Sequence, residues 1–260
     1  MPAPENTLKT RLAEGRESFG IWLGLADAYT AEIAATAGFD WLLIDGEHAP
    51  NDIRSLSAQL AVIDGTGTVP VIRLPDDDPA KIKQALDIGA QTLLIPMIES
   101  GAQAAAAVKA CLYPPEGGRG VGSALARASK FGAIPDYLVT ANDQICVILQ
   151  VESRAGLAAL DDILRIDRLD AVFVGPSDLA ADMGYPGQPG HAAVRGAVMQ
   201  ALRDIRAAGK AAGILTTDPA YIEEARQNGA VFVGVGIDVT ILSAALRGLA
   251  SRYVSSRSGM

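Results

Sequence analysis

The sequence predicts a closed (β/α)₈ barrel, the TIM-barrel architecture, and three observations predict it. Eight short apolar runs alternate with eight segments of helical periodicity along the chain. Strands that alternate with helices of this length pair in parallel through right-handed crossovers. The 260 residues are close to the ~250 typical of such a barrel. We therefore expect one domain over residues 1–260, with its core at about 19–249.

Each expected strand is a short apolar run, too apolar to lie anywhere but in the core. The strands are expected at about 19–25, 41–45, 69–74, 92–97, 145–151, 171–175, 211–215 and 231–236. The helices between them, rich in Ala, Leu and charged residues, are expected at 28–37, 51–63, 79–88, 101–111, 153–164, 191–208, 218–228 and 237–252. Gly38, Gly89 and Gly229 precede strands and suit helix C-caps at the barrel floor.

One long segment interrupts this alternation after the fourth strand. It runs from Tyr113 through a glycine-rich stretch at 117–122 to a short helix expected near 134–141. Loops this long in a compact domain are usually functional, so the segment either covers the site or reaches a neighbouring subunit. A plain surface excursion is the alternative.

Charge and composition exclude several classes of partner. The formal net charge of -8 argues against nucleic acid and anionic membranes, which attract basic patches. The N-terminus lacks a basic-then-apolar signal pattern, and no apolar run approaches the ~20 residues that span a bilayer. Cys111 and Cys146 lack the spacing of a zinc site or disulfide framework and suit core thiols. We expect a cytoplasmic enzyme.

The candidate site residues follow the expected strands, where barrel enzymes keep their active sites. Two acids that follow neighbouring strands, Glu152 and Asp178, are expected to converge at this rim and to bind a metal. Alternatively, each serves the N-terminus of the next helix. The other candidates at the rim are Trp22, Asp45, Glu47, His48, Arg73, Gln150, the turn Gly175-Pro176-Ser177, and Leu215.

Some of these side chains also have a structural interpretation. Arg73 could neutralise rim acids, and His48 or Asp45 could cap its own turn. For His191, which follows Gly190 in a loop that leads into a helix, the structural interpretation is preferred.

Two carboxylates without a His or Cys cluster suit a hard cation such as Mg²⁺ or Mn²⁺, with water or substrate oxygens in the remaining positions. A 2-oxo acid such as pyruvate would chelate that cation, and Arg73 would stabilise the charge of the developing enolate. The alternative route to an enolate equivalent is a lysine Schiff base. None of the lysines follows an expected strand: Lys9, Lys81, Lys83, Lys109, Lys130 and Lys210. The metal mechanism is therefore preferred.

At these residues the chain resembles the HpcH/HpaI aldolases, a family of metal-dependent class II pyruvate aldolases, from about Phe19 to Leu249. The most specific segments are Ile44-Asp45-Gly46-Glu47-His48, Val71-Ile72-Arg73, Gln150-Val151-Glu152 and Gly175-Pro176-Ser177-Asp178-Leu179, supported by Arg119-Gly120-Val121-Gly122.

The resemblance implies a role for each residue. Glu152 and Asp178 would bind Mg²⁺ or Mn²⁺, with Co²⁺ also plausible, and Gln150 would lie beside the metal and its water. Arg73 would contact the pyruvyl carbonyl oxygen, and His48 would transfer protons with Asp45 nearby. The turn at 175–178 would offer backbone N–H groups to the substrate carboxylate, and Trp22 and Leu215 would line the substrate site.

The resemblance also implies a hexamer that exchanges C-terminal helices between subunits and brings Asp87 toward a neighbour's His48. By itself, Asp87 lies late in an expected helix, where a solvated or inter-subunit role is natural.

Three functions remain open. The leading one is a lyase that reversibly cleaves a 4-hydroxy-2-oxo acid to pyruvate and an aldehyde. The second is a malyl-CoA or citramalyl-CoA lyase-like enzyme, although this acidic chain shows no obvious surface for so large a cofactor. The third is a non-catalytic binder of metal and 2-oxo acid.

Overall fold

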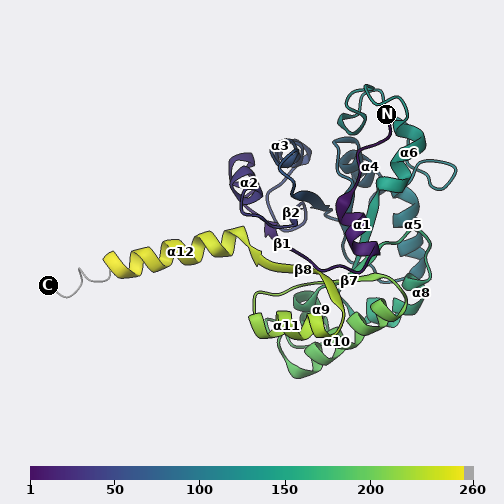
Figure 1. Ribbon diagram of the computed structural model, residues 1–260. Coiled ribbons are helices and arrows are strands. Elements are labelled where there is room, and N and C mark those ends of the chain that lie inside the picture. Colours follow the sequence, from purple (N-terminus) through teal and green to yellow (C-terminus); the bar gives the residue numbers. More distant parts are fainter. Residues whose placement is uncertain (255–260) are drawn as a thin grey trace.

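The computed structural model describes residues 1–254 and confirms the predicted barrel. Eight parallel strands close in sequence order, from β1 beside β2 through to β8 beside β1. The strands are β1 Ser18–Leu23, β2 Trp41–Asp45, β3 Val69–Arg73, β4 Thr92–Ile95, β5 Cys146–Val151, β6 Ala171–Val174, β7 Ala211–Leu215 and β8 Ala230–Ile237. Helices surround this ring (Figure 1).

The helices agree with most of the expected segments. They are α1 Thr7–Ala13, α2 Ala28–Ala35, α3 Ile53–Ile63, α4 Pro79–Asp87, α5 Gly101–Cys111, α6 Tyr137–Gln144, α7 Arg154–Ala158, α8 Leu160–Leu164, α9 Pro176–Asp182, α10 Ala192–Ala207, α11 Pro219–Gln227 and α12 Asp238–Tyr253, with a 3₁₀ turn η1 at Arg127–Ser129. The helix expected at 153–164 is two short helices that meet at Ala159. α1, α9 and η1 were not predicted.

Two expected strands end early for visible reasons. The first ends at Leu23 because the N–H groups of Gly24 and Leu25 donate to the carboxylate of Asp238. The fourth ends at Ile95 because Pro96 has no N–H and Met97 has a positive φ of 56°.

Alternation along the strands divides their side chains between two cores. Trp41 and Leu43 of β2 and Val71 of β3 belong to the cluster inside the barrel, whereas Leu42, Ile44 and Ile72 pack outward against the helices. Two residues after Leu43 and Val71, Asp45 and Arg73 point in the same inward direction. On β5 the same pattern runs from Ile148 to Gln150. The polar rim is thus the top layer of the barrel interior.

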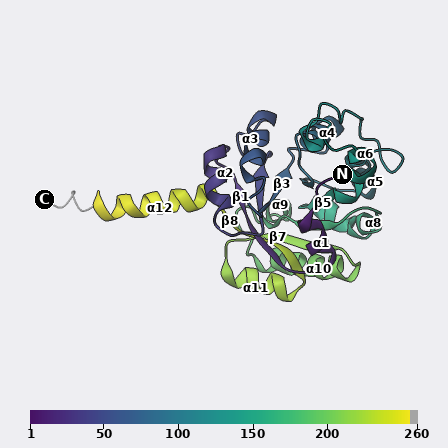
Figure 2. The same ribbon diagram turned by 45° about the horizontal axis from the view of Figure 1, so that its top comes forward.

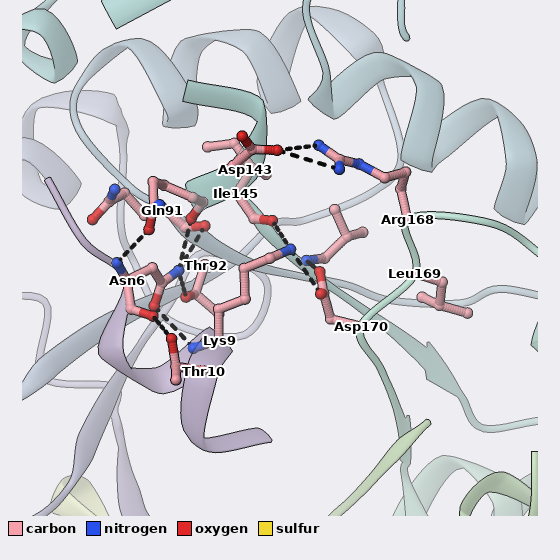
Figure 3. A network of polar contacts seen from close by, with 12 residues as sticks. Asn6, Lys9, Thr10, Gln91, Thr92, Asp143, Ile145, Arg168, Leu169 and Asp170 are labelled. Carbon is pink, nitrogen blue, oxygen red and sulfur yellow. Dashed lines mark hydrogen bonds and ion pairs between the residues drawn. The ribbon is translucent and has the colours of Figure 1, made fainter. Parts of the chain in front are cut away.

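The opposite end of the barrel is closed by α1. Leu8 and Leu12 belong to the interior cluster, and the predicted C-cap glycines at 38, 89 and 229 have positive φ at this floor. Figure 3 shows how the helix is fixed. The Asn6 amide donates to Thr92 Oγ1 and to the Gln144 carbonyl, each at 3.0 Å, while Lys9 Nζ donates to Asp170 at 2.7 Å.

The C-terminal helix α12 leaves the barrel and extends away from it in both ribbon views (Figures 1 and 2). None of its residues is buried. Five of its large side chains are exposed and recur with heptad spacing along one side: Val239, Leu242, Leu246, Leu249 and Tyr253. Over residues 1–254, no helix combines the length and apolarity needed to cross a membrane.

Candidate active site

Arg73 lies at the centre of one half of the rim. Asp45 and Arg73 are direct neighbours in the β2–β3 register, and Arg73 donates from Nε and Nη2 to both oxygens of Asp45, at 2.8 and 2.6 Å. Its Nη1 forms an ion pair with Glu47 Oε2 at 2.8 Å. The guanidinium is thereby held in place by two carboxylates.

The Asp45 carboxylate also organises its own turn, as one interpretation of the sequence anticipated. Its Oδ1 accepts from the Glu47 N–H at 3.0 Å and, more weakly, from the His48 N–H at 3.4 Å. The turn fits closely against β3, because a Cβ at Gly46 would lie 2.6 Å from the Arg73 carbonyl oxygen. Asp45 therefore positions both Arg73 and the turn that carries His48.

His48 is the most accessible titratable group of this cluster, with a side chain 64 % exposed. Its Nε2 lies 3.6 Å from Glu47 Oε2, and its link to Asp45 runs through the backbone N–H. An exposed imidazole beside a fixed arginine suits proton exchange with a substrate at the mouth of the barrel.

Glu47 belongs to this cluster, although it was not among the residues assigned a role from the sequence. Burial raises its pKa, an effect that Arg73 and His48 oppose and that Asp45 and Asp178 reinforce. Its position two residues after a strand end was the available signal. The residue links the arginine half of the rim to the carboxylate half.

Glu152 dominates the second half of the rim. It is 3 % exposed, its Oε1 accepts from the Met97 N–H at 3.0 Å, and its Oε2 accepts from the Gln150 amide. A Cβ at Gly175 would lie 2.6 Å from Glu152 Oε2, so only glycine leaves room for the carboxylate in this position. The local sequence thus builds a cradle around one carboxylate.

Asp178 contributes a second carboxylate near the first. The pKa of Glu152 is raised to about 7, mainly by burial; hydrogen bonds from Gln150 and Met97 oppose this rise, and the charges of Asp178 and Glu47 contribute to it. Gathered carboxylates with raised pKa values are stabilised by a cation.

The donor set fits a hard divalent cation. It consists of carboxylate oxygens, together with the buried Gln150 Oε1, which has no hydrogen-bond partner among residues 1–254. In the same part of the chain, no three His, Cys, Asp or Glu side chains gather as a metal cluster. A cation here would have two protein carboxylates, with water and substrate oxygens completing its coordination.

Part of the turn at 175–178 is already used within the protein. The Gly175 N–H donates to the Val151 carbonyl at 3.0 Å, and Pro176 has no N–H. Only Ser177 and Asp178, in the first turn of α9, have N–H groups that can face a ligand.

The remaining candidates lie outside these two clusters. Trp22 is 3 % exposed and packs inside the barrel against Trp41 and Phe173, while Leu215 ends β7 beside Gly234. Asp87 ends α4, which returns toward the floor, and accepts from Arg119 at 2.6 Å. His191 caps α10, as the preferred structural interpretation expected.

Crevices of about 560 to 570 Å³ flank α1 at the floor. None of the residues that line them is a candidate site residue. The candidate site residues therefore lie at the open rim and not in these crevices.

Residues 18–245 match the HpcH/HpaI aldolase/citrate lyase family. The chain belongs to this family. A hydroxypyruvate/pyruvate aldolase of Roseovarius nubinhibens is 58 % identical over 95 % of this chain and 96 % of its own length. A 4-hydroxy-2-oxo-heptane-1,7-dioate aldolase of Salmonella arizonae is 51 % identical over 96 % of this chain and 95 % of its own.

Comparison with a solved HpcH/HpaI structure confirms that this chain has the architecture of the family. The protein from Burkholderia cenocepacia superposes with a TM-score of 0.91 at 41 % identity, covering 95 % of this chain and 98 % of its own. The resemblance stated from the sequence motifs is therefore confirmed.

Proposed function

We propose that this HpcH/HpaI family member is a class II pyruvate aldolase that reversibly cleaves a 4-hydroxy-2-oxo acid to pyruvate and a small aldehyde. The observation that carries the proposal is that the buried Glu152 carboxylate, held by Met97 and Gln150, lies at the same rim as Arg73, which Asp45 and Glu47 hold. Relatives at 50 to 58 % identity are named aldolases, which favours this reaction over a CoA-ester lyase.

Glu152 and Asp178 would hold the divalent cation, and Gln150 Oε1 would accept from a water molecule beside it. Mg²⁺, Mn²⁺ and Co²⁺ all suit this donor set. When bound, the cation would supply Lewis acidity that polarises the 2-oxo group of the substrate.

Arg73 would donate to the oxygen that gains charge as the enolate of pyruvate forms. Its orientation by Asp45 and Glu47 means that little reorganisation is needed when that charge develops. His48, exposed at the mouth, would take the proton of the 4-hydroxyl group as the carbon–carbon bond breaks. The Ser177 and Asp178 N–H groups would receive the substrate carboxylate, and Trp22 and Leu215 would form the apolar wall.

We also propose that α12 docks on a second copy of the chain, in a hexamer that exchanges this helix between subunits. Leu242, Leu246 and Leu249 of α12 are exposed in the described part of the chain, and Tyr29 and Ile33 of α2 form another exposed apolar surface. A neighbour's Asp87 would complete the surroundings of His48 in such an assembly.

The experiment that tests the proposed function is a pyruvate-release assay over a panel of 4-hydroxy-2-oxo acids, with chelation and metal add-back. We expect release that stops with the chelator and returns with Mg²⁺ or Mn²⁺. Borohydride with pyruvate should trap no adduct. Chelator-resistant release together with a lysine adduct would replace the metal mechanism with a Schiff base.

A further inference from the structure

The segment that follows β4 carries the backbone group that holds Glu152. Met97 is a non-glycine residue with a φ of 56°, and its N–H donates to Glu152 Oε1 at 3.0 Å. Left-handed backbone is unfavourable for a residue with a side chain, so it persists only where neighbouring contacts impose it. The Met97 side chain is 49 % exposed, and packing around it is a weak constraint.

Gln103 contributes two hydrogen bonds that hold this segment. Its Nε2 donates to the Met97 carbonyl at 3.1 Å, and its Oε1 accepts from the Glu99 N–H at 2.9 Å. One amide on the first turn of α5 therefore binds the loop on both sides of Ile98. The Ile98 N–H donates in turn to the Gln150 carbonyl at 3.0 Å, which ties the same loop to β5.

The two oxygens of Glu152 are consequently oriented from two directions. Gln150 donates to Oε2, whereas Oε1 accepts from the N–H of Met97, whose carbonyl in turn accepts from Gln103. A carboxylate oxygen that accepts one hydrogen bond keeps a second lone pair for a cation. Partners of this kind orient a metal ligand without touching the metal.

We propose that Gln103 is a positioning residue for the metal site, acting through the Met97 peptide on Glu152. The inference rests on the proposed role of Glu152 as a metal ligand. Gln103 touches neither metal nor substrate, so its loss should weaken metal binding more than it lowers kcat at saturating metal.

The competing explanation is that Gln103 only stabilises the start of α5. Ser100 is the N-cap of this helix, and its Oγ accepts from the Gln103 N–H at 3.1 Å. Ser100→Ala removes the cap while keeping the Gln103 side chain and its bonds to the loop. It is therefore the matched control for helix stability.

The test measures Mn²⁺ affinity of the full-length protein by titration with detection of free Mn²⁺ by electron paramagnetic resonance. Gln103→Met keeps length and removes both hydrogen bonds, and we expect the Kd to rise about tenfold, the lower end for partners of metal ligands. Gln103→Asn, too short to span both groups, should act in the same direction if the first variant folds poorly. Ser100→Ala should lower the thermal midpoint and leave the Kd unchanged.

Each result decides between the alternatives. A Kd within twofold of wild type for both Gln103 variants, or an equal rise in Ser100→Ala, would overturn the positioning role. Glu152→Ala tests the proposed metal ligand separately from its positioning residue. Unaltered Mn²⁺ binding in Glu152→Ala would remove the proposed ligand itself, whereas lost binding there with wild-type binding in Gln103→Met would remove only the positioning role.

Discussion

Arg73 and His48 are expected to act at different moments of the reaction. Arg73→Lys keeps a charge beside Asp45 and Glu47 but loses the planar fork, so both aldol cleavage and proton exchange at the pyruvate methyl group should fall, by about 10²–10³ for an oxyanion donor. His48→Asn should lower cleavage by roughly 10²–10⁴ and spare methyl exchange. Deuterium incorporation into pyruvate, compared with cleavage rates, checks both. Wild-type rates in both assays for either variant would remove the substituted residue from the mechanism.

The pH response of Glu152 has a definite sign. Its pKa is raised from 4.5 to about 7, mainly by burial, so the metal-free folded protein binds this proton more tightly than the unfolded chain. The unfolding free energy of the metal-free protein should therefore fall as pH rises from about 4.5 to about 7. A cation competes with the same proton, so metal affinity should rise over that interval.

Calorimetric metal titrations at several pH values, beside thermal unfolding of the metal-free protein, measure both trends. Glu152→Gln should flatten the stability profile. A metal affinity that does not change across this interval would contradict the assignment of Glu152 as a ligand.

The sequence placed most candidate residues at the rim because each follows an apolar run, but it could not predict which of them pair. Arg73 donates two hydrogen bonds to Asp45 because the β2–β3 register makes the two residues neighbours. That Glu152 is held by Met97 depends on a positive φ in a loop, and methionine gives no sequence signal for it. Gly175 was predicted as a ligand-binding turn, whereas the structure shows it making room for Glu152.

A substitution in α12 tests the proposed assembly. Leu246→Asp places a charge in its exposed apolar stripe and should reduce the oligomer to smaller species, measured by light scattering after size-exclusion chromatography. Ala244→Asp, on the opposite side of the helix, is the matched control and should leave the mass unchanged. An unchanged mass for Leu246→Asp would show that this stripe is not an intersubunit contact.

The floor helix α1 should contribute to stability without contributing to catalysis. Asn6→Ala removes an N-cap and leaves buried groups of Thr92 and Gln144 without a donor, at a cost of about 2 kcal/mol. For a chain of this size that lowers Tm by roughly 4–8 °C. The kcat at 25 °C should stay at the wild-type value because the rim is at the other end of the barrel. A large loss of kcat in the folded variant would show that the two ends are coupled.

Sequence patterns predicted the long elements and missed the short ones. The eight strands are continuous apolar runs and long helices such as α10 have an extended buried face, whereas α1 has seven residues and only two buried side chains. α9 begins at Pro176, where proline is favoured in the first helical turn but also suits a plain turn. The helix expected from about 134 begins at Tyr137, because the residue before Pro135 is held out of helical conformation.

Closure of the barrel brings the candidate site residues to one rim. The inward side chains of parallel strands end in one layer, so Asp45 and Arg73 from β2 and β3 lie at the same rim as the carboxylates that follow β5 and β6. The chain has a net charge of -8, and an anionic substrate needs a local cation. Arg73 and a divalent metal would supply it at the rim that carries Glu152 and Asp178.

Metal-dependent formation of the pyruvate enolate is the central claim, and it can be measured without knowing the aldehyde. Pyruvate is incubated with the protein in D₂O, and loss of the methyl proton signal is followed by nuclear magnetic resonance. The proposed mechanism predicts exchange that is fast with Mg²⁺ or Mn²⁺, falls to the background rate after chelation, returns on metal add-back, and is absent in Asp178→Ala. Exchange that continues undiminished after complete metal removal, or at the wild-type rate in Asp178→Ala, would contradict it.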